Sequence, residues 1–509
     1  MARALAVRPS LCNIGRVSNH VLALDVGTSS VRASRYGADG TLIPGSAIRI
    51  AHQVSYLSDG GVETDADALY ERLAGAVDHC LAASPGAVAA VGISCFWHSL
   101  MGLDASLHPC TPVLVWADTR SAAQAESLAR ELDAEAVRAR TGCRFHPSYP
   151  PAKLRWVRRN RPDWWQAAAH WVSFGEYLVF RLGGELVASL SLASGSGLYD
   201  QRRGVWDAEV CAAAGIAPAS LPAVADLSES RLKVRSGGRW PDLDGASLLL
   251  PAGDGACNNV GSGCMGQGRI ALMIGSSGAV RRCQAGGPWT VPGSLWQYRL
   301  DRRRGLVGGA LSNGGNLHQW LLEQLRLDGG VEEALLAREP GAHGLIFLPL
   351  LAGERSPGWA PSAWGGVLGL REATTALDLL QAGMEAVAQG FAALVRDVGP
   401  DGQVIGSGGG VWHSPAWARM LADALGRDIH RSAEAEASSR GAALLALESM
   451  GAVGPLEALD PPLGDMVRAD PGRQAIYRRG WDRQLRLYEI LRADGRIGFA
   501  GPRSDPAGE

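Results

Sequence analysis

The chain has 509 residues, and its 49 lysines and arginines almost balance 51 aspartates and glutamates, giving a formal net charge of -2. This balance excludes the strong positive field of nucleic-acid and membrane-surface proteins, so we expect a small-molecule partner, no nucleic acid and no membrane. Lysine occurs only at Lys153 and Lys233, neither of them in a GxxxxGK[ST] loop, which excludes a lysine P-loop nucleotide enzyme.

The cysteines and the chain ends indicate where the protein works. The nine cysteines form no CxxC pair, which favours a reducing, cytoplasmic location over a disulfide framework or a zinc ribbon. Residues 1–19 hold too short an apolar run for a secretory signal, so we predict a disordered leader there. Residues 492–509 are predicted to form a flexible tail.

The first strong pattern is a β-hairpin predicted over residues 21–36, where two β-prone runs flank a Gly-Thr-Ser-Ser turn at residues 27–30. Backbone N–H groups of such a turn form a concavity that binds phosphate. Asp25 ends the first strand and supplies an oxygen ligand suited to Mg²⁺, and Arg32 follows on the return strand. Taken alone, a turn-capping Asp25 with a surface Arg32 is the commoner arrangement.

Two further buried strands are predicted over residues 87–95 and 112–116, and polar side chains follow each of them. His98 follows the first strand, and Asp118 and Arg120 follow the second. With His146 they are candidate hydrogen-bonding groups for a polyol in one cleft. For any one of them alone, an internal hydrogen bond is at least as good an interpretation.

Asp254 lies between two glycines, after a predicted strand at residues 247–252 and before a stretch of small residues that begins like a helix. Glycine on both sides lets a substrate approach closely. A carboxylate at this corner can accept the proton of a hydroxyl that attacks phosphorus. Alone, an Asp that caps the helix is the simpler interpretation.

A second hairpin is predicted over residues 270–282, and its turn repeats the first: Gly27 matches Gly275 and Ser29 matches Ser277 at a constant offset of 248. A chance match of Gly-Ser turns is the alternative. Because the offset is close to half the chain, we predict an α/β fold of two related domains facing across a nucleotide and substrate cleft. The expected boundaries are residues 20–262 and 263–491.

The sequence predicts two further structural elements in the second half of the chain. Apolar residues spaced as one helix face predict a core helix from Thr375 to Val398, with Thr375 and Asp378 as a capping box. A strand at residues 404–405 precedes a glycine loop at residues 406–410, and Ser414 with Pro415 then starts a helix. This strand, loop and helix start suit the adenosine and phosphates of a nucleotide, although a plain loop is equally compatible.

Together these segments resemble the FGGY family of carbohydrate kinases from about Val21 to about Leu491. Residues 148–160 fit the first family signature, and residues 365–385 fit the second except at Gly383. The resemblance implies the actin-like, or ribonuclease-H-like, fold, Asp254 as catalytic base and Asp25 near Mg²⁺. It implies that ATP is bound by Thr28, Ser29, Ser30, Arg32, Ser276, Ser277, Gly315, Gly409, Gly410 and Ser414. It implies that the acceptor is bound by His98, Ser99, Asp118, Arg120, His146, Asp254 and Asn258.

Within that family, residues 94–99, 116–121, 140–147 and 351–359 look most like gluconokinases, although Trp97 stands where a smaller residue is expected. The resemblance implies transfer of the γ-phosphoryl group of ATP to D-gluconate. A pocket containing Arg120, His98 and His146 would neutralise the carboxylate of gluconate. A xylulokinase or another ketose or polyol kinase is the alternative within the family, and a non-catalytic ATP-binding actin-like protein is the alternative outside it. The sequence is also compatible with a homodimer.

Overall fold

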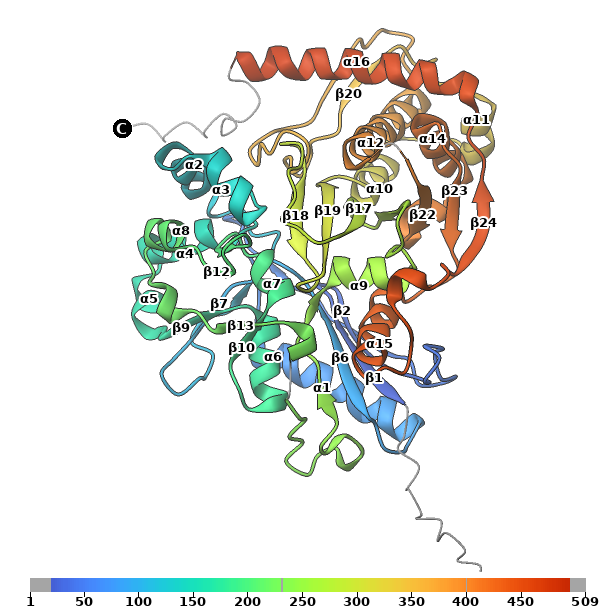
Figure 1. Cartoon of the computed structure of the whole chain (residues 1–509). Coiled ribbons are helices and arrows are strands. Elements are labelled where there is room, and N and C mark those ends of the chain that lie inside the picture. Colours follow the sequence, from blue (N-terminus) through green and yellow to red (C-terminus); the bar gives the residue numbers. More distant parts are fainter. Residues whose placement is uncertain (1–19, 230–231, 400, 495–509) are drawn as a thin grey trace, which may run out of the picture.

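The structure, a computed structural model, describes residues 20–229, 232–399 and 401–494, so the predicted leader at residues 1–19 and most of the predicted tail lie outside the described residues. Figure 1 shows two lobes, each built around one sheet, with α9 between them and α16 along one side of the second lobe. The α/β class and the two-lobed arrangement expected from the repeated hairpin are confirmed. No helix among the described residues is long and apolar enough to cross a membrane.

The sheet of the first lobe has the order β14-β6-β1-β2-β3, with β15 also paired to β6. The antiparallel pair of β1 and β2 is the predicted first hairpin, and β6 adds in parallel to β1. The bounds are β1 Val21–Val26, β2 Ser30–Tyr36, β3 Ile48–Ala51, β6 Ala90–Cys95, β14 Ser247–Leu248 and β15 Ala252–Gly253. The predicted strand at residues 247–252 is therefore interrupted, because only its two ends pair with β6.

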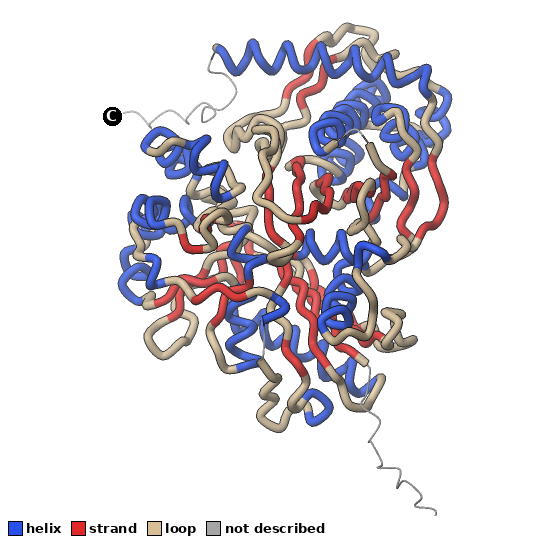
Figure 2. The backbone as a smooth tube through the Cα atoms, in the orientation of Figure 1, coloured by secondary structure: helices blue, strands red, loops and turns tan. Residues whose placement is uncertain are grey.

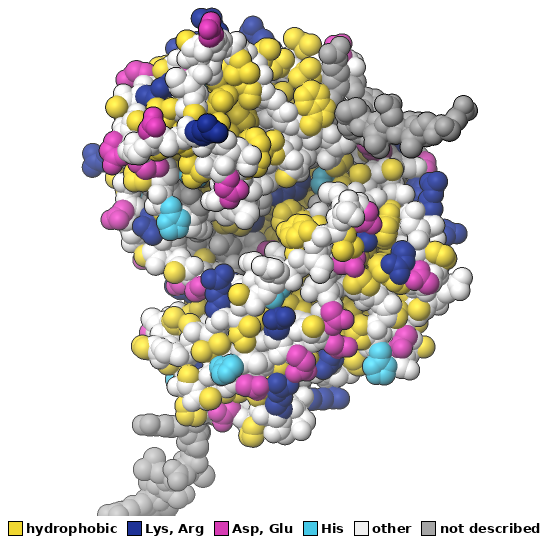
Figure 3. Space-filling view, turned by 180° about the vertical axis from the view of Figure 1, so that it is seen from behind, with side chains coloured by type: hydrophobic (Ala, Val, Ile, Leu, Met, Phe, Trp, Pro, Cys, Tyr) yellow, Lys and Arg dark blue, Asp and Glu magenta, His cyan; other side chains and the backbone are white. Residues whose placement is uncertain are grey.

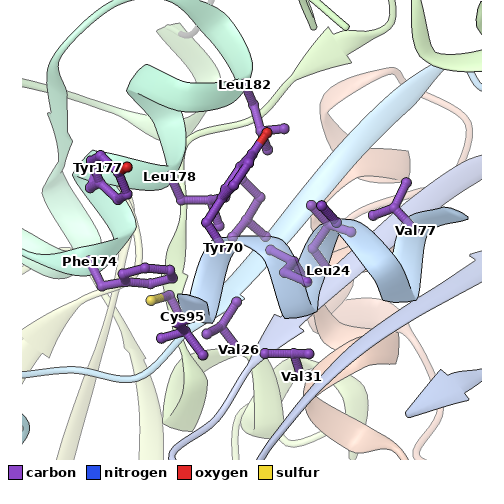
Figure 4. Close-up of a cluster of buried hydrophobic side chains, with 14 of the residues drawn as sticks. Leu24, Val26, Val31, Tyr70, Val77, Cys95, Phe174, Tyr177, Leu178 and Leu182 are labelled. Atoms are coloured by element: carbon purple, nitrogen blue, oxygen red, sulfur yellow. The ribbon is translucent and has the colours of Figure 1, made fainter. Parts of the chain in front are cut away.

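Every residue of β1 is buried because helices cover both faces of the sheet. Leu22 and Leu24 pack on one face against α1 (Ala66–Ala83) and α6 (Phe174–Gly183), in the apolar cluster of Figure 4. Val21 and Ala23 belong to a different cluster on the other face, together with residues of α9 and α15. The continuous apolar run in the sequence thus follows from two-sided burial.

The rest of the first half forms short strands and a group of helices beside this sheet (Figure 2). The small strands pair as β4-β5-β8, β7-β9, β10-β13 and β11-β12. Their bounds are β4 Ser55–Tyr56, β5 Val62–Thr64, β7 Met101–Leu103, β8 Val113–Leu114, β9 His170–Val172, β10 Val187–Ser189, β11 Tyr199–Asp200, β12 Val205–Trp206 and β13 Ala223–Ala225. The helices are α2 Ala122–Glu131, α3 Ala134–Thr141, α4 Pro150–Asn160, α5 Pro162–Ala167, α7 Leu190–Ser194 and α8 Ala208–Ala214.

The second lobe repeats the arrangement of the first with a sheet of order β18-β19-β17-β16-β22-β23-β24. Its β16 and β17 form the predicted second hairpin, and β22 adds in parallel to β16 as β6 does to β1. The strands are β16 Arg269–Ile274, β17 Gly278–Ala285, β18 Trp296–Arg299, β19 Arg304–Leu311, β22 Gln403–Ser407, β23 Ile429–Ser432 and β24 Leu463–Val467; β20 Ile346–Leu348 and β21 Gly366–Leu368 pair separately. The equivalence of the two hairpins is therefore structural as well as sequential.

The predicted core helix is α12, Ala376–Val398, with Thr375 as N-cap and a capping box to Asp378. It packs with β16 and α14 in the core of the second lobe. The other helices of this half are α10 Gly315–Gln324, α11 Val331–Ala337, α13 Gly409–Trp412, α14 Pro415–Leu425, α15 Ala437–Ser449 and α16 Pro471–Ala493. The last helix continues two residues beyond the boundary at residue 491 that the sequence predicts.

Two helices cross at very short range where the lobes meet: α9, Asp254–Gly261, and α15. A Cβ atom at Gly441 would lie 1.9 Å from the Cys257 carbonyl oxygen, and one at Gly261 would lie 1.8 Å from the Ala437 carbonyl oxygen. Only glycine permits this approach. Because α15 also packs on β1 and β6, the second half of the chain buries one face of the first lobe's sheet and holds α9 in place.

Candidate active site

Asp254 lies at the corner where β15 turns into α9. A Cβ atom at Gly253 would lie 1.9 Å from the Trp97 ring, and one at Gly255 would lie 2.7 Å from the Arg281 Nε, so the corner requires both glycines. The Gly255 N–H donates to Asp254 Oδ1 at 2.8 Å. Burial raises the pKa of the Asp254 carboxyl, and the charge of Arg281 opposes that rise. A carboxylate with a raised pKa suits the acceptance of a proton from a hydroxyl.

Asp25 is buried at the end of β1 and is held by both neighbouring strands. Arg32 Nη1 donates to its Oδ2 at 2.8 Å, and Ser94 Oγ donates to its Oδ1 at 2.7 Å. These contacts follow from strand register, since Asp25 lies opposite Arg32 on β2 and opposite Ser94 on β6. Arg32 Nε also pairs with Glu436 of the second half at 2.8 Å. Burial raises the pKa of Asp25, and its charge in turn raises the pKa of Asp254, so the two carboxylates lie in one electrostatic site.

Each lobe carries one of the two glycine turns, at the tip of its hairpin. In the first turn, residues 27–30, the first N–H donates to the carbonyl of the last residue at 3.0 Å, and Ser29 is exposed at the tip. In the second turn, residues 275–278, Ser276 is likewise exposed. Gly315 N donates to the carbonyl oxygen of Gly275 at 2.9 Å, so the structure brings this predicted nucleotide residue against the second turn. The predicted nucleotide residues on the turns are Thr28, Ser29, Ser30, Ser276 and Ser277.

The glycine loop after β22 contacts the Asp254 helix. Ser407 Oγ donates to Asn258 Oδ1 at 3.3 Å, which joins α9 of the first half to the start of the loop. Gly409 and Gly410 begin α13. Ser414 is buried, and its Oγ accepts a backbone N–H of the first turn of α14 at 3.1 Å, as the predicted N-cap. Its hydroxyl therefore stabilises a helix start, while its role toward a nucleotide stays a prediction.

His98 and His146 both contact Tyr149, with ring centroids 4.8 and 6.4 Å from the tyrosine ring. His98 has a left-handed backbone with φ of 66°, which is uncommon outside glycine and concentrates at functional sites. Lys153 Nζ donates to the His98 carbonyl oxygen at 2.7 Å, and His98 Nδ1 lies 2.6 Å from the Gly195 carbonyl oxygen. Burial lowers the pKa of each histidine to about 3, so both rings are neutral near pH 7.

Asp118 and Arg120 form an ion pair with each other. Arg120 Nη2 pairs with Asp118 at 2.5 Å and with Glu63 at 2.8 Å, and its guanidinium lies 4.4 Å from the centroid of the Trp156 ring. Two carboxylates therefore already compensate the charge of Arg120. Ser99 is also engaged, because its Oγ accepts the backbone N–H at the start of α6 at 3.1 Å. Neither contact involves Asp254 or the glycine turns.

No catalytic or binding role was assigned from the sequence to several residues that the structure places in this site. Tyr149 and Tyr298 share a hydrogen bond between their hydroxyl groups at 2.6 Å. The guanidinium groups of Arg281 and Arg355 influence the same two tyrosines or Asp254 through their charge. A useful signal was available for Lys153, one of only two lysines in the chain. Arg355 lies in the gluconokinase-like segment at residues 351–359, but that likeness assigned it no role, and no pattern singled out Arg281.

Comparison with known proteins identifies the family of the chain. Residues 20–237 match the N-terminal domain of the FGGY family of carbohydrate kinases, and residues 272–450 match its C-terminal domain. A gluconokinase of Bacillus subtilis is 27% identical over 482 residues, covering 89% of this chain and 92% of the relative. A glycerol kinase of Citrifermentans bemidjiense is 28% identical over 507 residues, covering 92% and 98%.

The solved structures give the same fold. The crystal structure of gluconate kinase from Lactobacillus acidophilus superposes with a TM-score of 0.85 at 23% identity, covering 93% of this chain and 98% of that one. The two-lobed fold is thus shared with this structure over 93% of the chain. The chain belongs to the FGGY family of carbohydrate kinases.

Proposed function

We propose that this carbohydrate kinase transfers the γ-phosphoryl group of ATP to the 6-hydroxyl of D-gluconate, giving 6-phosphogluconate. The observation that carries the proposal is the position of Asp254, at the meeting point of the lobes and in one electrostatic site with Asp25. The Bacillus subtilis relative described as a gluconokinase favours gluconate among the acceptors.

In the proposed reaction Asp254 accepts the proton of the attacking hydroxyl. The backbone N–H groups at the tips of the two glycine turns hold the phosphates from opposite lobes, where charge develops during transfer. Arg32 fixes the Asp25 carboxylate through their 2.8 Å hydrogen bond. Closure of the lobes would exclude water and so suppress hydrolysis of ATP.

The donor set also fits Mg²⁺. Among the described residues no group of three or more His, Cys, Asp or Glu side chains forms a metal cage. Mg²⁺ commonly uses one or two carboxylates together with phosphate oxygens and water, and Asp25 offers a carboxylate beside the first turn. When bound, the ion neutralises charge on the phosphates, and it would also offset the repulsion between Asp25 and Asp254.

On the acceptor side, the neutral rings of His98 and His146 are suited to hydrogen bonds with sugar hydroxyls. Tyr149 contacts both rings and adds a phenol. Lys153 Nζ donates to the backbone carbonyl oxygens of His98 and Val115, each at 2.7 Å, and so fixes the backbone of His98. The pocket is thereby rigid before the acceptor arrives.

The test is an ADP-release assay with D-gluconate, D-xylulose, glycerol and no acceptor, followed by mass spectrometry of the product. We expect the highest kcat/KM for gluconate and a product heavier by one phosphoryl group. A preference for xylulose or glycerol would overturn the choice of gluconate while leaving a sugar kinase. Absence of turnover with a wider panel of sugars and sugar acids, together with measurable ATP binding, would favour the non-catalytic alternative.

A further inference from the structure

Two arginines with buried side chains, Arg304 and Arg120, are neutralised by carboxylates. Arg304 pairs with Asp301 at 2.6 Å and with Glu448 at 2.7 Å, and its side chain is 3% exposed. Arg120, with a side chain 5% exposed, is held by two carboxylates in the same way. This pairing has a physical reason, because a cation removed from water without a counter-charge is strongly unfavourable.

Arg355 has no ion pair of this kind among the described residues, and neither have the buried Arg35, Arg281 and Arg299. Its half-buried side chain donates one hydrogen bond, from Nη2 to the Leu311 carbonyl oxygen at 3.0 Å, and its guanidinium lies 4.9 Å from the centroid of the Trp116 ring. Its Nε has no partner in the part of the chain that the structure describes. No Asp or Glu among the described residues forms an ion pair with it, and burial lowers its pKa. Arg355 therefore carries a cation and unused donors without a protein counter-ion.

The surroundings of Arg355 are those of the acceptor pocket. Its charge acts on the phenols of Tyr149 and Tyr298, and more weakly on Asp254. It also acts on both candidate acceptor histidines, His98 and His146. Figure 3 shows the surface hollowed between the two lobes. The unpaired guanidinium thus belongs to the same site as the proposed base.

The sequence prediction gave the neutralisation of an acceptor carboxylate to Arg120, His98 and His146. The geometry does not favour that choice, because Arg120 already has Asp118 and Glu63, and because the histidine rings are neutral. Lys153 also has no carboxylate within ion-pair distance among the residues that the structure describes, but it donates to two carbonyl oxygens and burial lowers its pKa to about 7. Arg281 and Arg355 are left as the cations of this site that have no ion pair among the described residues.

We infer that Arg355 binds the carboxylate of a sugar-acid acceptor and so selects aldonic acids over neutral sugars. The inference rests on the proposed function and names the residue that sets its substrate class. Guanidinium and carboxylate form strong charge-assisted hydrogen bonds, and the ligand would supply the counter-charge that the protein withholds.

An anionic oxygen could also come from the phosphoryl group in transfer, which offers Arg355 the same chemistry. The neighbours of Arg355 favour the carboxylate: Trp116, Tyr149 and His146 all come from the acceptor-side segments of the first lobe. Arg281 is the arginine that lies against the Asp254 corner, and Asp254 is the strongest charge acting on it. Arg281 is therefore the better candidate for the reacting end of the acceptor.

The experiment compares D-gluconate with D-gluconamide, a neutral acceptor of nearly the same shape, in wild type, Arg355→Gln and Arg355→Lys. Arg419→Gln is the matched control, because Arg419 likewise donates from Nη2 to one carbonyl oxygen, that of Leu336 at 2.8 Å, and has an unpartnered Nε far from Asp254 in the second lobe. Each variant is assayed for kcat/KM with both acceptors and for the KM of ATP. Acceptor binding is also measured without ATP by tryptophan fluorescence.

Wild type should prefer gluconate, and Arg355→Gln should lose about 30-fold or more in kcat/KM for gluconate. In the same variant, kcat/KM for gluconamide and the KM of ATP should each change by less than about threefold. Arg355→Lys should give an intermediate loss with gluconate, since lysine keeps the positive charge but cannot form the paired hydrogen bonds of a guanidinium. Equal losses with both acceptors would instead place Arg355 on the phosphoryl group, and unchanged kinetics would also overturn the inference.

The two proposals fail differently. If wild type turns over another aldonic acid but not gluconate, the proposed function is wrong as to substrate, and the effect of Arg355→Gln on that acid still decides the inference. If wild type turns over neutral sugars alone and binds no sugar acid in the fluorescence measurement, the inference is wrong. If gluconate is the preferred acceptor and Arg355→Gln has no effect, the inference fails and the proposed function stands.

Discussion

The hydroxyl groups of Tyr149 and Tyr298 lie 2.6 Å apart and join α4's N-terminal end in the first half of the chain to β18 in the second. Both side chains are buried, and Tyr298 also stacks on Trp296 at 4.1 Å between ring centroids. Because one hydroxyl donates a hydrogen bond to the other, the pair stabilises the contact between the two halves of the chain near Arg355.

Tyr298→Phe should lower the free energy of unfolding by about 1–3 kcal/mol, because it leaves the Tyr149 hydroxyl buried without its partner. The double change Tyr149→Phe/Tyr298→Phe should lower it by less than the sum of the single changes. Urea denaturation measures all three variants, with Tyr56→Phe as the control since Tyr56 is 76% exposed. Additive effects would show that the hydroxyl groups do not interact in solution.

Gly441→Ala should disturb the active site from a distance. The added Cβ would meet the Cys257 carbonyl oxygen at 1.9 Å and push α9, which carries Asp254, away from α15. We expect a loss of about 1–3 kcal/mol in stability, together with a lower kcat. Gly454→Ala is the control, because a Cβ there meets nothing within 4 Å. Wild-type kcat and stability in Gly441→Ala would contradict the close helix crossing.

The buried histidines predict how stability depends on pH. The pKa of His146 falls from 6.5 to about 3 in the folded protein. The unfolded chain therefore binds a proton that the folded ring rejects, so this contribution to stability is complete above pH 6.5 and is lost as the pH falls toward 3. His146→Asn should reduce the loss of unfolding free energy between pH 7 and 5 by about 2 kcal/mol.

Denaturation at several pH values measures this effect, and His108→Asn is the control because the His108 side chain is 78% exposed. An equal change of slope in the two variants would mean that the His146 ring titrates normally.

Arg281→Gln should alter the pH profile of the reaction. The positive charge of Arg281 lowers the pKa of Asp254, so its removal should raise that pKa further. Since the base acts in its ionised form, the acid limb of the kcat/KM profile should move to higher pH, and Arg281→Lys should move it back toward wild type. A lower kcat with an unmoved acid limb would give Arg281 a role that does not act through Asp254.

Much of the architecture was predictable because it depends on residues that are close together in the sequence. The hairpin turns at residues 27–30 and 275–278 carry matching glycines, and each turn joins two central strands of its own sheet. The capping box of Thr375 and the N-cap of Ser414 were likewise predicted, since both depend on residues a few positions apart. The strand-to-helix corner at Asp254 follows from the glycines on both sides of it.

The contacts that complete the site depend on residues far apart in the chain. Nothing near residue 441 indicates that α15 lies against the first lobe's sheet, and Gly441 acquires its meaning only from Cys257 across the crossing. Similarly, the Asp118-Arg120 segment looks like a ligand-binding pair until Glu63 is found as a second counter-ion. The unpaired state of Arg355 is a property of the assembled site, which no sequence spacing records.

The measurement that tests the central claim most directly is the turnover of Asp254→Asn with ATP and D-gluconate, set beside its affinity for ATP. Asp423→Asn is the matched control, because Asp423 is also a buried carboxyl whose pKa burial raises, and it binds the Asp470 N–H at 2.8 Å on the α14 side of the second lobe. If Asp254 is the base, its variant should lose about 100-fold or more in kcat while the Kd for ATP changes by less than about threefold. An Asp254→Asn protein that keeps more than about a tenth of wild-type kcat would contradict the account.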